Sequence, residues 1–250
     1  MDREVEGKVV VVTGAANGLG LAIVTSFLEQ GVGLAILLDI DKKKGKEVVA
    51  DLQQRYGDDR AVFYKCDVID DLEKVFGKIY DNHENIDILV NNAGVLDESN
   101  IKKTMDINTN AVMEWTVKFY KKMSVANGGR GGTIINVSSI FGYRITPFIP
   151  YYHASKYAVI GFSKSIGNEL NFQKSGVRVV TLCPGLTHSN MTGNPNAWED
   201  SLDEFLEHLT MYEWQDASAI GDGTVDIFRY GNPGSVWVVE GSRPAVEIGV

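Results

Sequence analysis

The sequence has few of the residues that build covalent or metal-stabilised frameworks. Only Cys66 and Cys183 occur among its 250 residues, which is too few for a disulfide framework and favours a reducing compartment. The four histidines are scattered, and none forms a metal-ligand pattern with another histidine or a cysteine. The sequence therefore predicts no metal site.

Long apolar runs, an apolar leader and a surplus of positive charge are also missing. No stretch approaches 18 apolar residues, and the segment from Met1 to Lys8 is charged. A net charge of −9 argues against binding to a nucleic-acid backbone or an anionic membrane. We expect a cytoplasmic protein whose partner is a small molecule, with no nucleic acid and no membrane.

Short apolar runs recur along the chain, with no repeat, low-complexity segment or linker between them. Each is rich in Val, Ile or Leu and bounded by Gly, Asp or Asn, which is typical of strands buried on both faces. The segments between them have helical spacing, as at Ile23, Phe27 and Leu28. The runs are Val9–Val12, Leu34–Leu38, Val62–Tyr64, Ile86–Val90, Thr133–Val137, Val177–Leu182 and Ser235–Val239.

Alternation of strand and helix predicts parallel strands joined by right-handed crossovers. We expect an α/β protein with a doubly wound Rossmann fold. Its parallel sheet should have about seven strands, with helices on both faces. The length suits one domain over residues 1–250.

A glycine-rich turn follows the first apolar run. Gly14, Gly18 and Gly20, with Asn17 and Leu19 between them, lie where a strand should pass into a helix. Missing side chains let backbone amides approach a pyrophosphate, and the helix N-terminus adds a favourable field. Tight turns use glycine in any case, so the weight of this motif comes from the strand before it and the helix after it.

Asp39 ends the second predicted strand. A carboxylate there binds the hydroxyl groups of an adenosine ribose and repels a 2′-phosphate. Lys42, Lys43 and Lys44 follow closely, but they are expected to open a solvated helix. The sequence therefore favours NAD over NADP; the alternative is an ordinary acid at a strand end.

Two further strand ends carry candidate cofactor residues. Asp67 and Val68 follow the third strand, where Asp67 is placed to reach an adenine amino group. Asn92, Ala93 and Gly94 follow the fourth, at the edge where open sheets bind ligands. The alternative for the second motif is a polar turn without a ligand.

Tyr152 and Lys156 are four residues apart in a predicted helix and so share a face. A nearby ammonium lowers the pKa of a phenol, which would let Tyr152 act as a base near neutral pH. A tyrosine and a lysine four residues apart occur by chance in many helices, so the alternative is a solvated surface pair without a function. Its weight comes from Ser139, which stands thirteen residues upstream; the neighbouring Tyr151 has no lysine at the same spacing.

With these residues in place, the chain resembles the short-chain dehydrogenase/reductase family in its single-domain form. It is similar above all to the branch of insect-type alcohol dehydrogenases and 15-hydroxyprostaglandin dehydrogenases. The family match is carried, in order and spacing, by Gly14, Gly18, Gly20, Asp67, Asn91 to Gly94, Asn108, Ser139, Tyr152, Lys156 and Pro184-Gly185. The similarity to the branch is carried by Gly94 to Asp97, Lys103 to Asn108, Asn127 to Gly132 and Pro184 to Ser189.

The resemblance implies four catalytic positions. Asn108 would hold a water that relays protons through Lys156, and Ser139 would hydrogen-bond the substrate oxygen. Tyr152 would take the hydroxyl proton while hydride passes to nicotinamide. Lys156 would lower the pKa of Tyr152 and bind the nicotinamide ribose. Ser138 is the competing serine, but strand neighbours face opposite ways, so only one of the two can serve.

Pro184 and Gly185 are further implied cofactor residues. The family usually places a threonine after them that bonds the nicotinamide carboxamide. Here the matching residue is Ser189, and Thr187 is a second candidate.

The resemblance also implies that residues 186–215 or so cover the substrate. Aromatic residues there and between Ser139 and Tyr152 favour an apolar pocket, although such stripes are usually core. No Arg or Lys occurs between Gly185 and Gly221, which leaves Arg144 as a possible partner for a substrate carboxylate.

We therefore expect an NAD-dependent dehydrogenase acting reversibly on a secondary alcohol. Its substrate should be lipophilic: a simple, terpenoid, steroid or hydroxy fatty alcohol. The alternatives are an NAD(P)H-dependent carbonyl reductase and a non-catalytic NAD-binding protein. The family resemblance further implies a homodimer or homotetramer.

Overall fold

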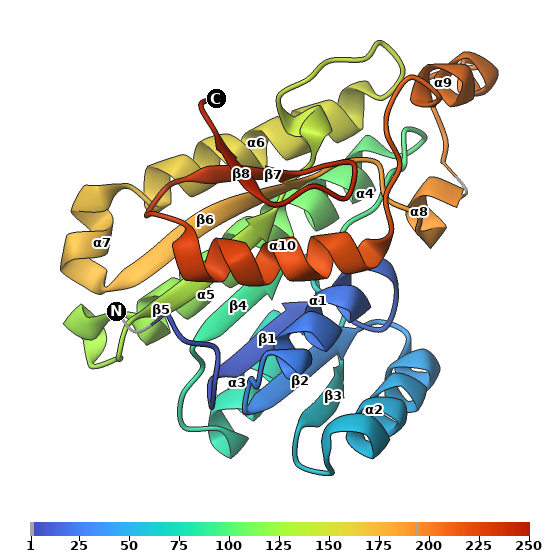
Figure 1. The fold of residues 1–250 in the computed structure, drawn as a ribbon. Coiled ribbons are helices and arrows are strands. Elements are labelled where there is room, and N and C mark those ends of the chain that lie inside the picture. The colour runs from blue at the N-terminus through green and yellow to red at the C-terminus, as the bar shows by residue number, and fades with distance from the viewer. Residues whose placement is uncertain (1–2, 194) are drawn as a thin grey trace.

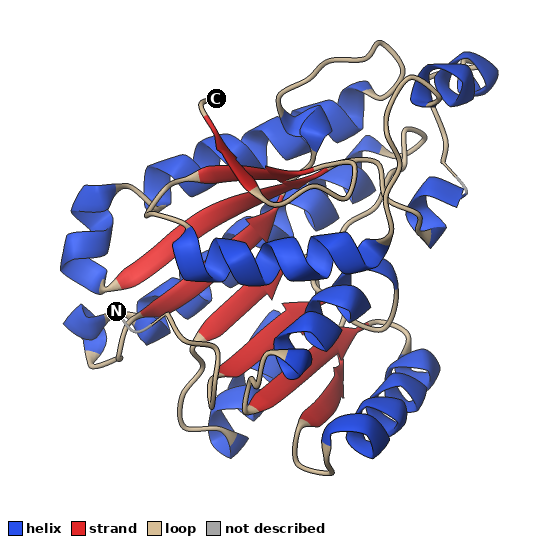
Figure 2. Cartoon of the chain, viewed as in Figure 1, coloured by secondary structure: helices blue, strands red, loops and turns tan. Residues whose placement is uncertain are grey.

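One twisted sheet runs through the computed structural model, which describes residues 3–193 and 195–250 (Figures 1 and 2). Its strand order in this described part is β3-β2-β1-β4-β5-β6-β7-β8. The first seven strands are parallel, and β8 pairs antiparallel with β7. The strands are β1 Val9–Thr13, β2 Leu34–Asp39, β3 Ala61–Lys65, β4 Ile88–Asn91, β5 Gly132–Val137, β6 Val177–Pro184, β7 Val236–Val239 and β8 Val246–Ile248.

The predicted doubly wound fold is confirmed, and each of the seven predicted runs overlaps a strand. The sequence did not predict β8. This strand has only three residues and is mostly exposed at the sheet edge, where Val246 is 55% exposed. A strand that buries so little has no apolar run by which to recognise it.

Helices cover both faces of the sheet (Figure 1). Apolar side chains of α1, α2 and α10 pack on one face, and those of α3 and α5 pack on the other, beside α6. None of the described helices is long and apolar enough to cross a membrane. The helices are α1 Gly18–Glu29, α2 Lys42–Tyr56, α3 Leu72–Asn82, α4 Ile101–Met105, α5 Val112–Met123, α6 Pro150–Ile166, α7 Glu169–Ser175, α8 Asn190–Gly193, α9 Leu202–Leu209 and α10 Ala217–Tyr230.

Parallel pairing brings the carboxyl ends of the strands to one edge of the sheet. Thr13 pairs with Leu38 of β2, and on the other side of β1 its neighbour Val12 pairs with Val90 of β4. Asn91 then pairs with Asn136 of β5. The loops that follow these strands therefore leave from one edge, which is where open α/β sheets bind ligands.

A buried polar network centred on Asn136 joins the sheet to the helices behind it. The Asn136 Oδ1 accepts hydrogen bonds from Asn91 Nδ2 at 2.8 Å and from the Thr116 hydroxyl of α5 at 3.0 Å. Its Nδ2 donates to the Ser163 hydroxyl of α6 at 2.9 Å. The side chain is fully buried, so every one of these bonds replaces lost contact with water.

Replacing Asn136 with alanine should lower the free energy of unfolding by about 2–4 kcal/mol, because it removes three buried hydrogen bonds and leaves the Thr116 hydroxyl without its acceptor. Urea denaturation measures this loss. Asn82→Ala, which removes an exposed amide bonded only to the Lys78 carbonyl, is the control and should change stability by less than about 1 kcal/mol. Equal stability of the two variants would contradict the role given to the network.

Candidate active site

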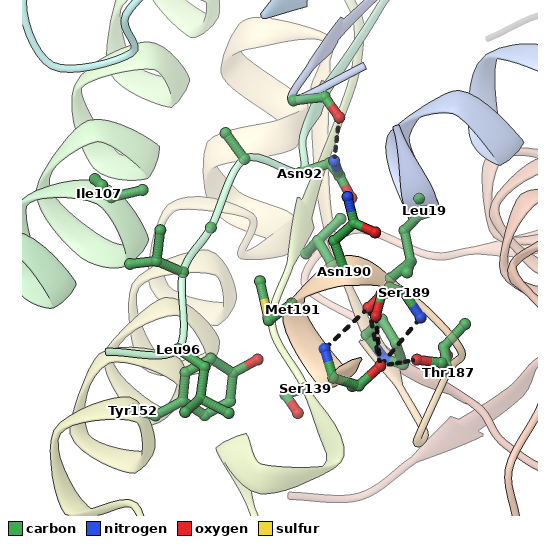
Figure 3. A pocket seen from close by; sticks show the side chains of 18 of the residues that line it. Leu19, Asn92, Leu96, Ile107, Ser139, Tyr152, Thr187, Ser189, Asn190 and Met191 are labelled. Atoms are coloured by element: carbon green, nitrogen blue, oxygen red, sulfur yellow. Dashed lines mark hydrogen bonds between the residues drawn. The ribbon is translucent and has the colours of Figure 1, made fainter. Parts of the chain in front are cut away.

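A cavity of about 610 Å³ opens at the carboxyl edge of the sheet, and we call it the edge cavity (Figure 3). Nearly all the residues singled out from the sequence line it, whereas Gly20 and Asn108 do not. The predicted residues in its wall are Gly14, Asn17, Gly18, Leu19, Asp39, Asp67, Val68, Asn92, Ala93, Gly94, Ser139, Tyr152, Lys156, Pro184, Gly185, Thr187 and Ser189.

The glycine turn has the backbone conformation that its sequence requires. Gly14 and Gly18 have φ of +63° and +52°, the left-handed region that favours glycine. Gly20 serves packing, since a Cβ there would lie 2.1 Å from the Gly14 carbonyl oxygen. Helix α1 begins at Gly18, whose N–H donates to Asn17 Oδ1 at 2.8 Å, and the first turn of the helix adds a positive field suited to a diphosphate.

The start of the loop after β4 is fixed to β1 by paired hydrogen bonds. The Thr13 hydroxyl accepts from the backbone N–H groups of Asn92 and Ala93, each at 3.0 Å. In return, Asn92 Nδ2 donates to the carbonyls of Thr13 at 2.9 Å and Gly14 at 3.2 Å (Figure 3). These bonds fix the start of the loop to the end of β1, where Asn92 and Ala93 line the cavity.

Asp39 lines the cavity at the end of β2, and β1 and β4 lie between β2 and the β5 strand that precedes Ser139. Its Oδ2 accepts from the Ala16 N–H of the glycine turn, and its Oδ1 accepts from the Asp41 N–H, both at 2.9 Å. These bonds hold an anionic carboxylate next to the turn. Among the cavity-lining residues that the structure describes, the only cations are Lys103 and Lys156, and Lys103 is paired with Asp97.

Ser139, Tyr152 and Lys156 come together from the end of β5 and from α6. Tyr152 and Lys156 are almost entirely buried, and Lys156 Nζ lies 5.6 Å from the centre of the tyrosine ring. The Ser138 hydroxyl donates to the Lys156 carbonyl at 2.8 Å, so that hydroxyl is used within the fold. Tyr151 is absent from the cavity wall and packs on Trp198, 5.2 Å between ring centres.

Burial controls the protonation of this group. It raises the pKa of Tyr152 to about 12, against a smaller lowering by the Ser139 hydroxyl, and it lowers the pKa of Lys156 to about 8. The expected lowering of the tyrosine pKa by Lys156 is therefore wrong for the ligand-free protein. The lysine Nζ donates to the Val137 carbonyl at 3.0 Å, and burial is the main cause of the raised tyrosine pKa.

Asn108 lies behind the cavity in a π-helical turn, Asp106–Ala111. Its Nδ2 donates to the Val95 carbonyl at 2.8 Å and the Ser155 hydroxyl at 3.1 Å, and its Oδ1 accepts from the Val95 N–H at 2.8 Å. The side chain thus joins the loop after β4 to α6. Both Nδ2 hydrogens are used in these bonds, so a relay water would have to donate to Oδ1 or bind the Asn108 backbone.

Thr187 and Ser189 both reach the cavity (Figure 3). The Thr187 hydroxyl donates to the Gly185 carbonyl at 2.9 Å, and the Ser189 hydroxyl lies 3.1 Å from that of Thr192. The structure brings both candidates to the site, and the choice between them stays a prediction.

The cavity wall beyond Ser139 and Tyr152 is apolar. Of the aromatic residues singled out in the sequence, Phe141 and Phe205 line it, whereas most of the others pack elsewhere. Arg144 is not in the wall, because it forms a two-pronged ion pair with Glu240 at 2.7 and 2.9 Å. Leu186 and Met191 also line the cavity and fall within the predicted covering segment, whereas Leu96, in the loop after β4, had no predicted role in the site.

Comparisons with known proteins agree with this geometry. The family model for short chain dehydrogenases matches residues 8–200. The 15-hydroxyprostaglandin dehydrogenase [NAD(+)] of Rattus norvegicus is 37% identical, over 90% of this chain and 87% of the relative. The alcohol dehydrogenase-related 31 kDa protein of Drosophila melanogaster is 28% identical, over 88% of this chain and 82% of the relative.

Solved structures show the same fold at lower identity. The L-sorbose reductase from Gluconobacter frateurii, complexed with NADPH, aligns with a TM-score of 0.79 and 23% identity, covering 96% of this chain and 98% of that one. A 3-ketoacyl-(acyl-carrier-protein) reductase from Brucella melitensis, complexed with NADH, aligns with a TM-score of 0.79 and 23% identity. The alignment covers 95% of this chain and 98% of that one. The chain belongs to the short-chain dehydrogenase family.

Lys156→Met should stabilise the ligand-free protein at pH 7, by about 1–3 kcal/mol, because it removes a buried charge. The lysine's folded pKa of about 8 lies below its ordinary 10.5, so its penalty is full below pH 8 and fades as pH approaches 10.5. Denaturation of both proteins at pH 7 and pH 9.5 measures the difference, which should shrink at the higher pH.

The matched control is Lys164→Met, an exposed lysine on the same helix, which should leave stability nearly unchanged at both pH values. A Lys156→Met protein less stable than the original at pH 7, or a difference independent of pH, would refute the burial argument.

Proposed function

We propose that this short-chain dehydrogenase is an NAD-dependent enzyme that interconverts a lipophilic secondary alcohol and its ketone. One observation carries the proposal. Ser139, Tyr152 and Lys156 line the same cavity as the glycine turn and Asp39. A proton-transfer group and a dinucleotide site in one cavity are the parts that hydride transfer needs.

NAD fits the residues of the cavity. The amides at the start of α1 suit its diphosphate, and Asp39 suits a ribose that carries free hydroxyls. A 2′-phosphate there would meet an anion with no free cation beside it among the described residues of the wall. The prostaglandin dehydrogenase relative is named for NAD(+), whereas the solved neighbours hold NADPH or NADH, so Asp39 supplies the argument for NAD.

The protein's own part of the reaction is binding and proton transfer. The Ser139 hydroxyl hydrogen-bonds the substrate oxygen, and Tyr152 takes the hydroxyl proton of the alcohol. Because burial holds the tyrosine pKa at about 12, the phenol needs added positive charge before it serves as a base. NAD held by the glycine turn and Asp39 would supply the hydride acceptor and a positively charged ring, while Lys156 keeps an ammonium beside the tyrosine.

The substrate class follows from the apolar end of the cavity. Phe141, Leu186 and Phe205 offer contact area without a charge. Arg144, the partner that the sequence suggested for a substrate carboxylate, is paired with Glu240. The segment of residues 186–215, of which 194 lies outside the described residues, supplies part of this wall and covers the substrate. Neutral terpenoid, steroid or long-chain alcohols fit best.

We also retain a homodimer or homotetramer and a cytoplasmic location as parts of the proposal. Family membership supports the first. The second is supported by Cys66 and Cys183, which are both buried free thiols.

Tyr152→Phe should lower turnover by about 10²–10⁴-fold and leave NADH binding within about twofold, because only the proton-transfer group is lost. Turnover is followed as NADH formation from NAD with alcohols running from 2-propanol to steroid and hydroxy fatty alcohols. Tyr151→Phe, a change at the adjacent tyrosine outside the cavity wall, is the control and should keep most of the activity.

The same panel separates the alternatives. Activity only from ketones with reduced cofactor would favour a carbonyl reductase. Tight NADH binding with no turnover on either side of the reaction would favour a non-catalytic NAD-binding protein.

Asp39→Asn should shift the ratio of kcat/KM for NAD over NADP toward NADP by about ten- to hundredfold, because it removes an anion facing the extra phosphate. Steady-state kinetics with each cofactor measures the ratio. Asp70→Asn, an exposed acid outside the cavity wall, is the control. An unchanged ratio would exclude Asp39 as the selecting residue.

A further inference from the structure

Helix α6, which carries Tyr152 and Lys156, begins without a local cap. It starts at Pro150, and the preceding Ile149 offers no side-chain hydrogen bond to the first turn. The first N–H groups of a helix have no partner within it and need acceptors from elsewhere, above all when buried. Tyr152 is itself a first-turn residue, so the partner of its N–H bears directly on where the phenol sits.

That partner is Glu98, more than fifty residues earlier in the chain. Its Oε2 accepts from the Tyr151 N–H at 2.9 Å, and its Oε1 accepts from the Tyr152 N–H at 2.7 Å. One carboxylate therefore holds both tyrosine amides. The positive end of the helix adds to the attraction of the two N–H donors.

Glu98 is only 4% exposed, so this contact is not a surface ion pair. Burial raises the pKa of Glu98, while the hydrogen bonds from the Tyr151 and Tyr152 amides lower it in part. A buried carboxylate is unfavourable unless donors compensate for the lost water. The donors in this case are the first-turn amides of the catalytic helix.

The backbone of Glu98 is held in turn by the segment that covers the substrate. The Glu98 N–H donates to Asn196 Oδ1 at 2.6 Å, and Asn196 Nδ2 donates to Asp97 Oδ1 at 3.2 Å. Pro195, beside Asn196, lines the edge cavity. The residue that binds the Glu98 backbone is therefore next to a residue of the cavity wall.

Trp198 gives the same segment a second attachment near the start of α6. Its ring packs on Tyr151, and its backbone N–H donates to the Phe148 carbonyl at 2.7 Å. The covering segment, Glu98 and the first turn of α6 therefore form one linked structure.

Contacts from α4 fix the loop that carries Asp97 and Glu98. The Asp97 carboxylate binds Lys103 Nζ at 2.9 Å and the Ser99 hydroxyl at 2.6 Å. The Thr104 hydroxyl donates to the Asp97 carbonyl at 2.7 Å. Glu98 thus projects from an anchored loop, which lets it set the position of the helix. Helix α4 packs against α6.

We propose that Glu98 is the positioning residue of the catalytic helix: it holds the backbone of Tyr152 and couples that position to the substrate-covering segment through Asn196. Glu98 does not touch the reacting atoms. It acts through Tyr152, whose phenol must stay within a small distance of the substrate hydroxyl. A displacement of about 1 Å at such a group lowers rates by about 10²-fold.

Hydrogen–deuterium exchange tests, without any substrate, whether Glu98 holds the Tyr151 and Tyr152 amides, a contact that we call the clamp. In Glu98→Ala, the Tyr151 and Tyr152 amides should lose protection by at least about tenfold, while amides in the second half of α6 should keep theirs. Glu98→Gln retains one acceptor oxygen and should show an intermediate loss, and it guards against a failure of the alanine variant to fold. Unchanged protection at both tyrosines would overturn the clamp.

Kinetics test the positioning role, which rests on the proposed function. Glu98→Ala should lower kcat by about 10²-fold and Glu98→Gln by about tenfold, while the Kd for NADH stays within about twofold. Glu169→Ala is the matched control, since it removes an exposed first-turn carboxylate from α7. Normal kcat with lost amide protection would overturn the positioning role.

A double-mutant cycle tests the coupling to the covering segment. If Asn196 acts through Glu98, the losses in kcat/KM caused by Asn196→Ala and Glu98→Ala should not multiply in the double variant. Multiplicative losses would overturn the coupling. If the unaltered protein turns over no alcohol or ketone, the proposed function fails, and the exchange experiment still decides on the clamp.

Discussion

Parallel pairing of β1, β2, β4 and β5 is the constraint on which the site depends. It places Thr13, Asp39, Asn91 and Val137 at one edge of the sheet, although they are far apart in the sequence. Each loop that leaves this edge then contributes one part of the edge cavity. The bonds from Thr13 to the loop after β4, and from Asp39 to the glycine turn, keep those parts in register.

Burial of α6 against this sheet gives the cavity its chemistry and its energetic cost. Tyr152 and Lys156 are both taken out of water, which disfavours the charged form of each. A fold selected for stability alone would place apolar side chains there. Exclusion of water also strengthens the electrostatic interaction between the tyrosine and any charge that enters the cavity. The buried pair is therefore suited to a positively charged cofactor.

Much of the fold and of the site was predictable, because the signals are local. Strands buried on both faces leave continuous apolar runs, and the glycine turn and the Tyr152–Lys156 spacing each lie within a few residues. Features that depend on distant contacts left no such signal. Glu98 binds the Tyr152 amide although the two residues are 54 positions apart in the sequence. The tyrosine pKa is raised by burial, which residue spacing does not reveal. The edge strand β8 is short and mostly exposed, so it needs no run of apolar residues that the sequence could reveal.

Transfer of deuterium is the measurement that tests the central claim most directly. The protein is incubated with NAD and a lipophilic secondary alcohol that carries deuterium on its carbinol carbon, and the NADH formed is analysed by mass spectrometry. The account predicts deuterated NADH together with the unlabelled ketone, because the hydride passes directly from carbon to cofactor within the edge cavity. Unlabelled NADH, or no NADH from any alcohol of this class, would contradict it.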